Sequence, residues 1–441
     1  MTHDYTTPDE PSELSVHEGP TNRSRRKFLG FAAAGVATAG GTAFALRGDG
    51  DVPAVSADGN APAGPTTTTT PLKATADYAA RTLVVVELAG GNDGLATVVP
   101  RNAGVLYDRR PSVHVPDEEL LDFTDEFGWN PNLERLSSHG VAALMGVGTL
   151  EQPDGSHFEM ERRWWSGQSS GTDLPATGFL GRLCDQLEDG QPVTGVSLGS
   201  GATPALLSEK AVTMGLTDPG SGWFLETDDP WFATMRRGLR DMAVGAGPAG
   251  PIPSARRGLS DTLAFAESLN RIDTESIRDR FPNSDLGWQF GLAAQLVSLD
   301  AGIRIVHIAH GGFDTHSGQR GDHDYLLMEL SDAMGAFLED IGDKRRGDST
   351  LVCTTSEFGR RVHDNDGGTD HGAASLALLA GPVEAGIHGE VPSLTQLDDD
   401  NLVATTDFEQ YYATLSETWF GVPASELLDS NVNPVDGLIT A

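Results

Sequence analysis

The stretch LVVVEL at residues 83–88, which runs into AGGNDG at residues 89–94, indicates how the chain folds. Three consecutive valines in an almost wholly apolar run are typical of a strand buried on both faces. The glycines that follow allow the backbone to turn sharply. The sequence therefore predicts a buried strand that ends in a tight polar loop carrying Asp93.

Four more short apolar runs, each followed by glycine or polar residues, are predicted strands: residues 141–147, 303–308, 350–354 and 375–379. An amphipathic helix is expected between the strands at 303–308 and 350–354, because one helical face collects Leu327, Leu330, Met334, Phe337, Leu338 and Ile341. Apolar strands separated by helices predict an α/β fold with a doubly wound, mostly parallel sheet and helices on both faces. Residues 220–290 combine helical patches with proline-rich turns, which suits a helical insertion or cap.

The N-terminal part of the chain differs in composition from the rest. Residues 1–46 are predicted to comprise a disordered region and an export signal, and residues 47–76 a linker of Thr, Pro, Gly and Ala. Residues 77–441 are long enough for one large α/β domain.

The export signal is the motif SRRKFL at residues 24–29, followed by a weakly apolar run over residues 30–46. An arginine pair before such a run is typical of twin-arginine signals. Two cleavage sites fit, at residues 43–45 and 55–57, and an uncleaved signal remains an alternative. We expect the twin-arginine translocase as a partner and a periplasmic, cell-surface or secreted protein, with membrane contact only through an uncleaved signal.

The chain is strongly acidic, with a formal charge of −34 over 441 residues. Such a charge repels nucleic-acid phosphates, so no nucleic-acid partner is expected. The two cysteines, Cys184 and Cys353, lack metal-binding spacing, and Cys353 lies in an apolar run that predicts burial. A disulfide between them is not implied.

Polar residues follow the predicted strands, where open α/β sheets bind their ligands. Asp93 follows the first strand, although Asn-Asp-Gly is also ordinary turn chemistry. Ser156 follows the second strand at the start of a helix, where positive potential suits a nucleophile that attacks an anion. The pattern S-x-x-E also fits a helix cap in which Ser156 pairs with Glu159.

The later strands lead to further candidates. Asp314 and His316, two apart in an extended segment, point the same way and make a workable metal pair. Seven of the 12 histidines lie between residues 307 and 388, which we interpret as a sign of a site because histidine is rarely core filler. Together with Glu357 and His371, these residues predict a divalent-metal site at one edge of the sheet.

Five motifs together resemble one family: GGNDGLxTVVP (residues 90–100), SHFE (156–159), FDTHxxQ (313–319), SEFGR (356–360) and GTDHG (368–372). They resemble the uncharacterised, twin-arginine-exported family catalogued as domain of unknown function 1501, which is grouped with the alkaline-phosphatase-like superfamily. The resemblance runs from about residue 80 to 425.

The resemblance implies a pair of divalent metals, with Zn, Mn, Mg and Ca all open. It places Asp314, His316 and His371 on the first metal, Asp93 and Glu357 on the second, and Ser156 as nucleophile. The sequence departs from alkaline phosphatases in the spacing of Asp314 and His316, and in Phe358, which stands where a histidine is expected. The core motif of formylglycine sulfatases is absent.

The resulting hypothesis is an exported, metal-dependent hydrolase of phosphate-type esters, with a small-molecule or polymeric substrate. The alternative is a non-catalytic extracytoplasmic binding protein on the same fold, which Phe358 and the altered Asp-His spacing favour.

Overall fold

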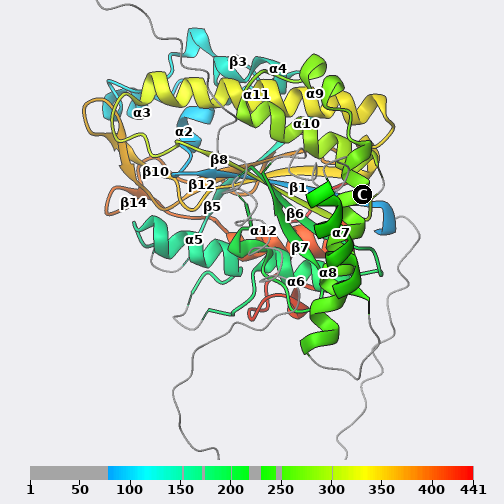
Figure 1. The fold of residues 1–441 in the computed structure, drawn as a ribbon. Helices are drawn as coiled ribbons and strands as arrows, with labels where there is room; N and C mark the ends of the chain where they lie inside the picture. The colour runs from blue at the N-terminus through cyan, green and yellow to red at the C-terminus, as the bar shows by residue number, and fades with distance from the viewer. Residues whose placement is uncertain are drawn as a thin grey trace, which may run out of the picture.

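A computed structural model describes residues 78–150, 153–170, 174–199, 201–217, 230–244, 251–299 and 301–440. Its centre is a nine-stranded sheet (Figure 1). The strands are β1 (Thr82–Ala89), β5 (Val141–Gly148), β6 (Gly195–Leu198), β7 (Thr213–Leu216), β8 (Ile305–Gly311), β9 (Thr350–Thr355), β12 (Ser375–Ala380), β13 (Gly386–His388) and β16 (Thr406–Asp407). All five strands predicted from the sequence are confirmed.

The sheet has the strand order β13-β5-β12-β9-β1-β8-β6-β7, and β16 pairs with β5. Strand β1 is central and pairs in parallel with both β8 and β9. Strand β12 is the exception, because it runs antiparallel to β9 and β5. The predicted mostly parallel α/β sheet is confirmed.

Helices cover both faces of the sheet (Figure 1). One face packs against α10 (Asp285–Ser298) and α11 (Gln319–Asp343), and the other against α5 (His157–Ser166), α6 (Phe179–Leu187) and α12 (Phe408–Ala413). In α11 the predicted apolar stripe is buried except for the half-buried Leu338. The period of that stripe therefore orients α11 on the sheet.

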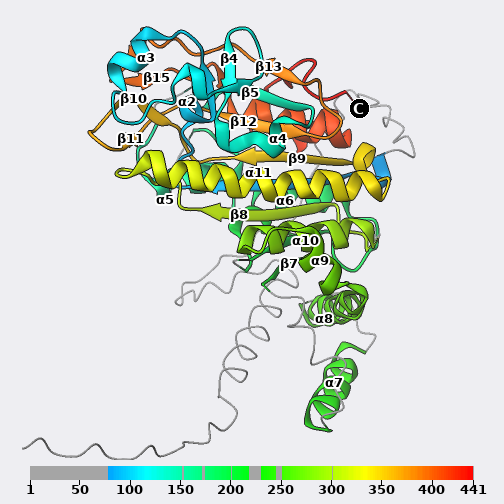
Figure 2. The ribbon, with the colours of Figure 1, turned by 90° about the horizontal axis from the view of Figure 1, so that it is seen from above.

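Helices α7 (Pro230–Ala243), α8 (Pro251–Ser268) and α9 (Thr274–Arg280) fill the region predicted as an insertion or cap. Figure 2 shows α7 on the outer side of α8, away from the sheet. Phe265 and Leu269 anchor the end of this excursion in the main core. Helix α9 begins where Asp273 accepts hydrogen bonds from the backbone of Glu275 and Ser276.

Smaller elements lie around the sheet: helices α2 (Gly94–Thr97), α3 (Gly104–Arg109) and α4 (Glu134–Ser137), the strands β2 (Val98–Pro100), β3 (Leu121–Asp122) and β4 (Phe127–Trp129), and the pairs β10 (Arg360–Asp364) with β11 (Thr369–His371) and β14 (Leu397–Asp398) with β15 (Asn401–Leu402). Both cysteines are buried and free. In the part of the chain that the structure describes, no helix is long and apolar enough to cross a membrane. The twin-arginine motif, both cleavage sites and the linker lie outside the described residues.

Candidate metal centre

The loops that carry the candidate residues meet at one edge of the sheet. Strands β1, β5, β8 and β9 share one direction, so their carboxyl ends lie together. Because β12 runs the opposite way, the residues that precede it arrive at this same edge. His371 therefore joins the residues that follow the other strands, which a wholly parallel sheet would prevent.

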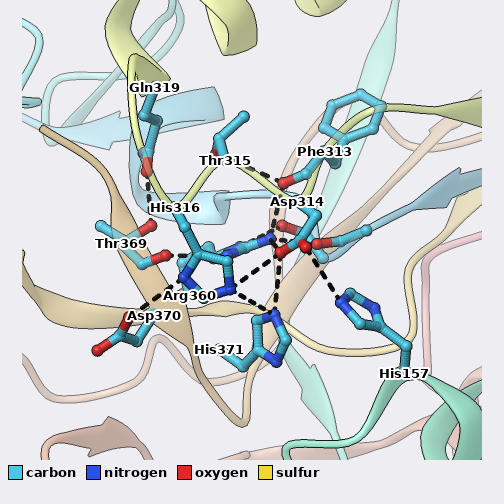
Figure 3. A network of polar contacts seen from close by, with 12 residues as sticks. His157, Phe313, Asp314, Thr315, His316, Gln319, Arg360, Thr369, Asp370 and His371 are labelled. Carbon is cyan, nitrogen blue, oxygen red and sulfur yellow. Dashed lines mark hydrogen bonds and ion pairs between the residues drawn. The ribbon is translucent and has the colours of Figure 1, made fainter.

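Three predicted ligands come together: Asp314, His316 and His371 (Figure 3). Asp314 Oδ1 lies 2.9 Å from His371 Nε2 and 3.2 Å from His316 Nε2. The two imidazole Nε2 atoms are 2.9 Å apart. The sequence reasoning placed these residues on one metal, and the structure brings all three side chains to one point.

His157 completes this group, and the sequence reasoning missed it. It is the first residue of α5, and its Nε2 lies 3.5 Å from Asp314 Oδ2. One ligand atom from each of His157, Asp314 and His371 lies within 4.8 Å of the others. A signal was available, since His157 follows a buried strand as directly as Ser156 does and histidine is the commoner metal ligand.

Each of the three imidazoles is held from behind through its Nδ1 atom. His157 Nδ1 donates to Glu357 Oε1 at 2.8 Å, and His371 Nδ1 donates to the Gly155 carbonyl at 2.7 Å. His316 Nδ1 lies 3.2 Å from Asp370 Oδ1. Carboxylates and carbonyls only accept hydrogen bonds, so each contact calls for a proton on Nδ1, and in a neutral ring this leaves the Nε2 lone pair free to bind a cation.

This arrangement fits a cation. Nε2 lone pairs facing one another and a carboxylate repel unless positive charge lies between them. Four tetrahedral ligands at zinc distances lie about 3.3 Å apart. One ligand atom each of His157, Asp314 and His371 lies within 4.8 Å of the others, and His316 Nε2, outside that group, lies 3.2 Å from Asp314 Oδ1 and 2.9 Å from His371 Nε2. The chemistry of the donor set and its spacing therefore fit a divalent ion such as Zn²⁺.

Arg360 holds the loops around this group. Its buried guanidinium donates to Asp314 Oδ1 and the Phe313 carbonyl, at 2.9 and 2.8 Å, and to the backbone of Gly90, Gly91 and Thr369. The loops after β1 and β8 and the start of β11 thus share one side chain. The sequence analysis gave Arg360 no role, because its partners are distant along the chain.

Asp314 is held in its ionised form. Partial burial opposes ionisation, but the imidazole of His371 and the guanidinium of Arg360 prevail and lower the pKa of Asp314 to about 2. The carboxylate is therefore charged and available for a cation at neutral pH.

Asp93 lies apart from this group. It is buried, caps α2 by accepting from the Leu95 amide, and forms an ion pair of 2.5 Å with Arg110. Burial opposes ionisation, yet Arg110 lowers the pKa of Asp93. The turn role that the sequence left open is thus observed, together with an arginine contact that it did not predict.

Glu357 is buried behind His157. Its Oε1 accepts hydrogen bonds from the Gly90 amide at 2.7 Å and from His157 Nδ1. Asp93 and Glu357, predicted to hold the second metal, are not joined in a group of ligand atoms among the described residues.

Ser156 precedes α5 and is exposed, with its backbone amide bonded to Asp154. The helix begins where the sequence predicts. The Ser156 side chain makes no capping hydrogen bond, and Glu159 pairs instead with Arg162 and Arg163. The capping-box interpretation is therefore wrong, since the local arginines engage the Glu159 carboxylate.

The clustering of histidines along the sequence was only partly a sign of the site. His307, His310 and His323 are buried, with partners elsewhere, and His363 pairs with Asp400 at the surface. Histidine does fill core positions here, because each buried ring has a hydrogen-bonding partner.

Residues 288–416 match the family model described as "Protein of unknown function (DUF1501)". The match confirms the resemblance to that family over this segment, which holds the motifs at residues 313–319, 356–360 and 368–372. The matched segment contains Asp314, His316, Glu357 and His371, whereas His157 precedes it. No curated protein matches the chain.

Solved structures resemble the fold loosely. The PsFucS1 sulfatase from Pseudoalteromonas sp. is 14% identical, with 81% of this chain and 70% of that chain covered and a TM-score of 0.35. The lipoteichoic acid synthase LtaP from Listeria monocytogenes is 9% identical, with 79% and 74% covered and a TM-score of 0.38. A mutant of the alkaline phosphatase PafA is 10% identical, with 81% and 99% covered and a TM-score of 0.38.

Proposed function

We propose that the protein is an exported, metal-dependent hydrolase of phosphate-type esters. The observation that carries this proposal is the convergence of three Nε2 atoms on the Asp314 carboxylate, with each Nδ1 atom engaged from behind. Acceptor atoms this close together lower the stability of the fold unless a cation lies between them, so the arrangement suits metal binding better than a purely structural role.

Asp314, His157, His316 and His371 would hold a divalent ion, which would stabilise negative charge developing on the ester oxygens. Glu357 and the Gly155 carbonyl keep the His157 and His371 rings oriented. Arg360 fixes the Asp314 carboxylate through its hydrogen bond. These residues organise the site before a substrate arrives.

Ser156 is the proposed nucleophile. It lies at the start of α5, where the helix dipole favours an anionic substrate, and its neighbour Gly155 contacts His371. Its hydroxyl would pass its proton to water, and the oxygen would bond to phosphorus as the ester oxygen leaves and takes up a proton. A second water molecule would then release phosphate from the serine.

Hydrolysis of aryl phosphate mono- and diesters tests the proposal, with purified protein and Zn²⁺, Mn²⁺, Mg²⁺ or Ca²⁺ added separately. We expect turnover with at least one metal, and its loss in Ser156→Ala with metal content unchanged. A folded sample inactive with every metal would refute the hydrolase.

A non-catalytic binding protein is the second candidate. The Phe358 ring lies 4.4 Å from the His371 ring and 4.9 Å from the His157 ring, so an apolar group occupies the space beside the ligands. Under this alternative, a phosphate ester binds in the presence of metal without turnover, and Ser156→Ala changes neither property.

Export by the twin-arginine translocase belongs to the same proposal. The motif SRRKFL and the apolar run after it support this route. Replacing Arg25 and Arg26 by lysine should retain the protein in the cytoplasm, which fractionation of the native host would reveal.

A further inference from the structure

We infer that this edge of the sheet binds one metal ion, and that the buried Arg110 guanidinium is the fixed cation at the place where Asp93 would otherwise take a second ion. The inference rests on the proposed function for the ion held by Asp314 and the three histidines. It goes further by replacing the expected second ion with a side chain of this protein.

Both oxygens of Asp93 already accept hydrogen bonds, and the Oδ2 atom accepts two of them. Oδ1 accepts from the Leu95 amide at 3.1 Å, while Oδ2 accepts from Arg110 Nη1 at 2.5 Å and from Gln319 Nε2. The side chains of Asp93 and Arg110 are each 1% exposed. An incoming ion would have to displace a buried arginine, which would leave that charge unpaired.

Gln319 presents the wrong polarity for a metal. Its Oε1 accepts from the Thr369 hydroxyl at 2.6 Å, which directs the amide NH₂ group toward Asp93. Hydrogen atoms of that group would repel a cation near the carboxylate. Gln319 and Thr369 are both buried, so this orientation is fixed by their packing.

Arg110 is anchored independently of Asp93. Its Nε donates to the Val362 carbonyl at 3.0 Å and its Nη2 to the Arg361 carbonyl at 2.5 Å. A guanidinium keeps its charge at all physiological pH values. Arg110 therefore supplies positive charge that neither a chelator nor acid removes.

Glu357 was the other predicted ligand of a second ion. Its carboxylate is also engaged by hydrogen-bond donors. Its Oε1 accepts from the Gly90 amide and from His157 Nδ1. We assign Glu357 as a positioning residue that orients His157 toward Asp314. Carboxylates behind metal-bound histidines commonly raise affinity for the ion 10- to 100-fold.

Elemental analysis of purified full-length protein tests the inference. Wild-type protein, His371→Ala and the neutral pair Asp93→Asn/Arg110→Gln are saturated with Zn²⁺ or Mn²⁺ and washed with a weak chelator. The metal content of washed wild type counts the tightly bound ions, and His371→Ala shows whether the Asp314 site holds them. We expect one equivalent in wild type, none in His371→Ala, and one in the neutral pair.

Two equivalents in wild type, one equivalent left in His371→Ala, or no metal in wild type would overturn the inference, as would loss of the ion from a folded neutral pair. If the neutral pair does not fold, the count from wild type and His371→Ala decides alone. Glu357→Gln should bind the ion about 10- to 100-fold more weakly while melting near wild type in chelator. Ester hydrolysis by the same samples separates the two proposals, because turnover with two ions refutes only the inference, and one ion without turnover refutes only the hydrolase.

Discussion

The loops after β1 and β8 share one arrangement, but their aspartates, Asp93 and Asp314, have different surroundings. Each follows a buried parallel strand, lies at the same edge of the sheet and presents an aspartate to a buried arginine. The Asp93 and Arg110 side chains are both buried, whereas the Asp314 side chain is 45% exposed and contacts Arg360 together with three imidazoles.

The difference arises from what surrounds each carboxylate. Around Asp93 the neighbours are donors, namely the Leu95 amide, Arg110 and the Gln319 amide. Around Asp314, besides the donor Arg360, three imidazoles face the carboxylate through Nε2, and Nδ1 of each ring faces an acceptor. A position after a strand brings an acidic residue to the edge, and the polarity of its neighbours decides whether it anchors the fold or is suited to an ion.

Removal of Arg110 is expected to have the largest effect on stability. Arg110→Ala strands the buried Asp93 carboxylate and should lower the free energy of unfolding by about 3–5 kcal/mol. Urea unfolding in the presence of a chelator measures this loss. Arg109→Ala is the matched control, since its partly exposed ion pair with Asp400, at 3.8 Å, should contribute less than about 1 kcal/mol. Equal losses in the two variants would contradict a structural role for Asp93.

Metal removal tests the loop after β8. An ion at 100 times its Kd stabilises a native state that alone binds it by about 2.7 kcal/mol. A chelator should therefore lower the melting temperature of wild type, and His371→Ala should abolish most of this effect. His363→Ala, which alters a surface pair with Asp400, should keep the full shift. A wild-type melting curve indifferent to chelator would remove the ion from this loop.

The buried His323 ring beside the loop after β1 should make the stability of the protein depend on pH. Burial lowers the pKa of His323, which lies 3.0 Å from Asn92 Oδ1, to about 4. Between pH 6.5 and about 4 the unfolded chain binds the extra proton, so stability falls as pH falls, by at most about 1.4 kcal/mol per pH unit. His323→Gln should flatten this slope in urea titrations from pH 7 to 4, whereas His363→Gln should leave it unchanged. An unaltered slope in His323→Gln would argue against the neutral buried ring.

The smallest expected effect concerns the start of α5. Ser156 makes no capping bond, so Ser156→Ala should change the free energy of unfolding by less than about 0.5 kcal/mol. Ser284→Ala is the matched control, because Ser284 Oγ accepts from the Gly287 amide at the start of α10 and its removal should cost about 1 kcal/mol. Thermal unfolding compares the two. A larger loss in Ser156→Ala would mean that its hydroxyl stabilises the fold.

The strands and the long helix could be predicted because each is decided by local apolar pattern. The run at residues 83–88 became β1, and the stripe from Leu327 to Ile341 gave the buried face of α11. Asp314, His316 and His371 could be proposed for the same reason, since a strand end fixes where a nearby side chain arrives.

What could not be predicted depends on contacts between distant residues. The ion pair of Asp93 with Arg110 and the three backbone loops joined by Arg360 leave no local pattern. The antiparallel direction of β12, which brings His371 to the ligands, is likewise decided by its neighbours in the sheet. His157 could have been predicted from the sequence, because it directly follows Ser156 at the start of the same helix, but only the serine was proposed.

The hairpin of β10 and β11 gives this architecture room to diversify. Strands β9 and β12 are central and antiparallel, so the chain between them leaves and re-enters the sheet on one side as a single excursion. At its tip, Asp366 has a positive φ of 69° and an added Cβ on Gly367 would meet open space. A longer tip that kept the bond from the Gln319 amide to the Gly367 carbonyl, at 3.0 Å, would change the approach to His371, so this hairpin is where related chains could vary around the proposed site.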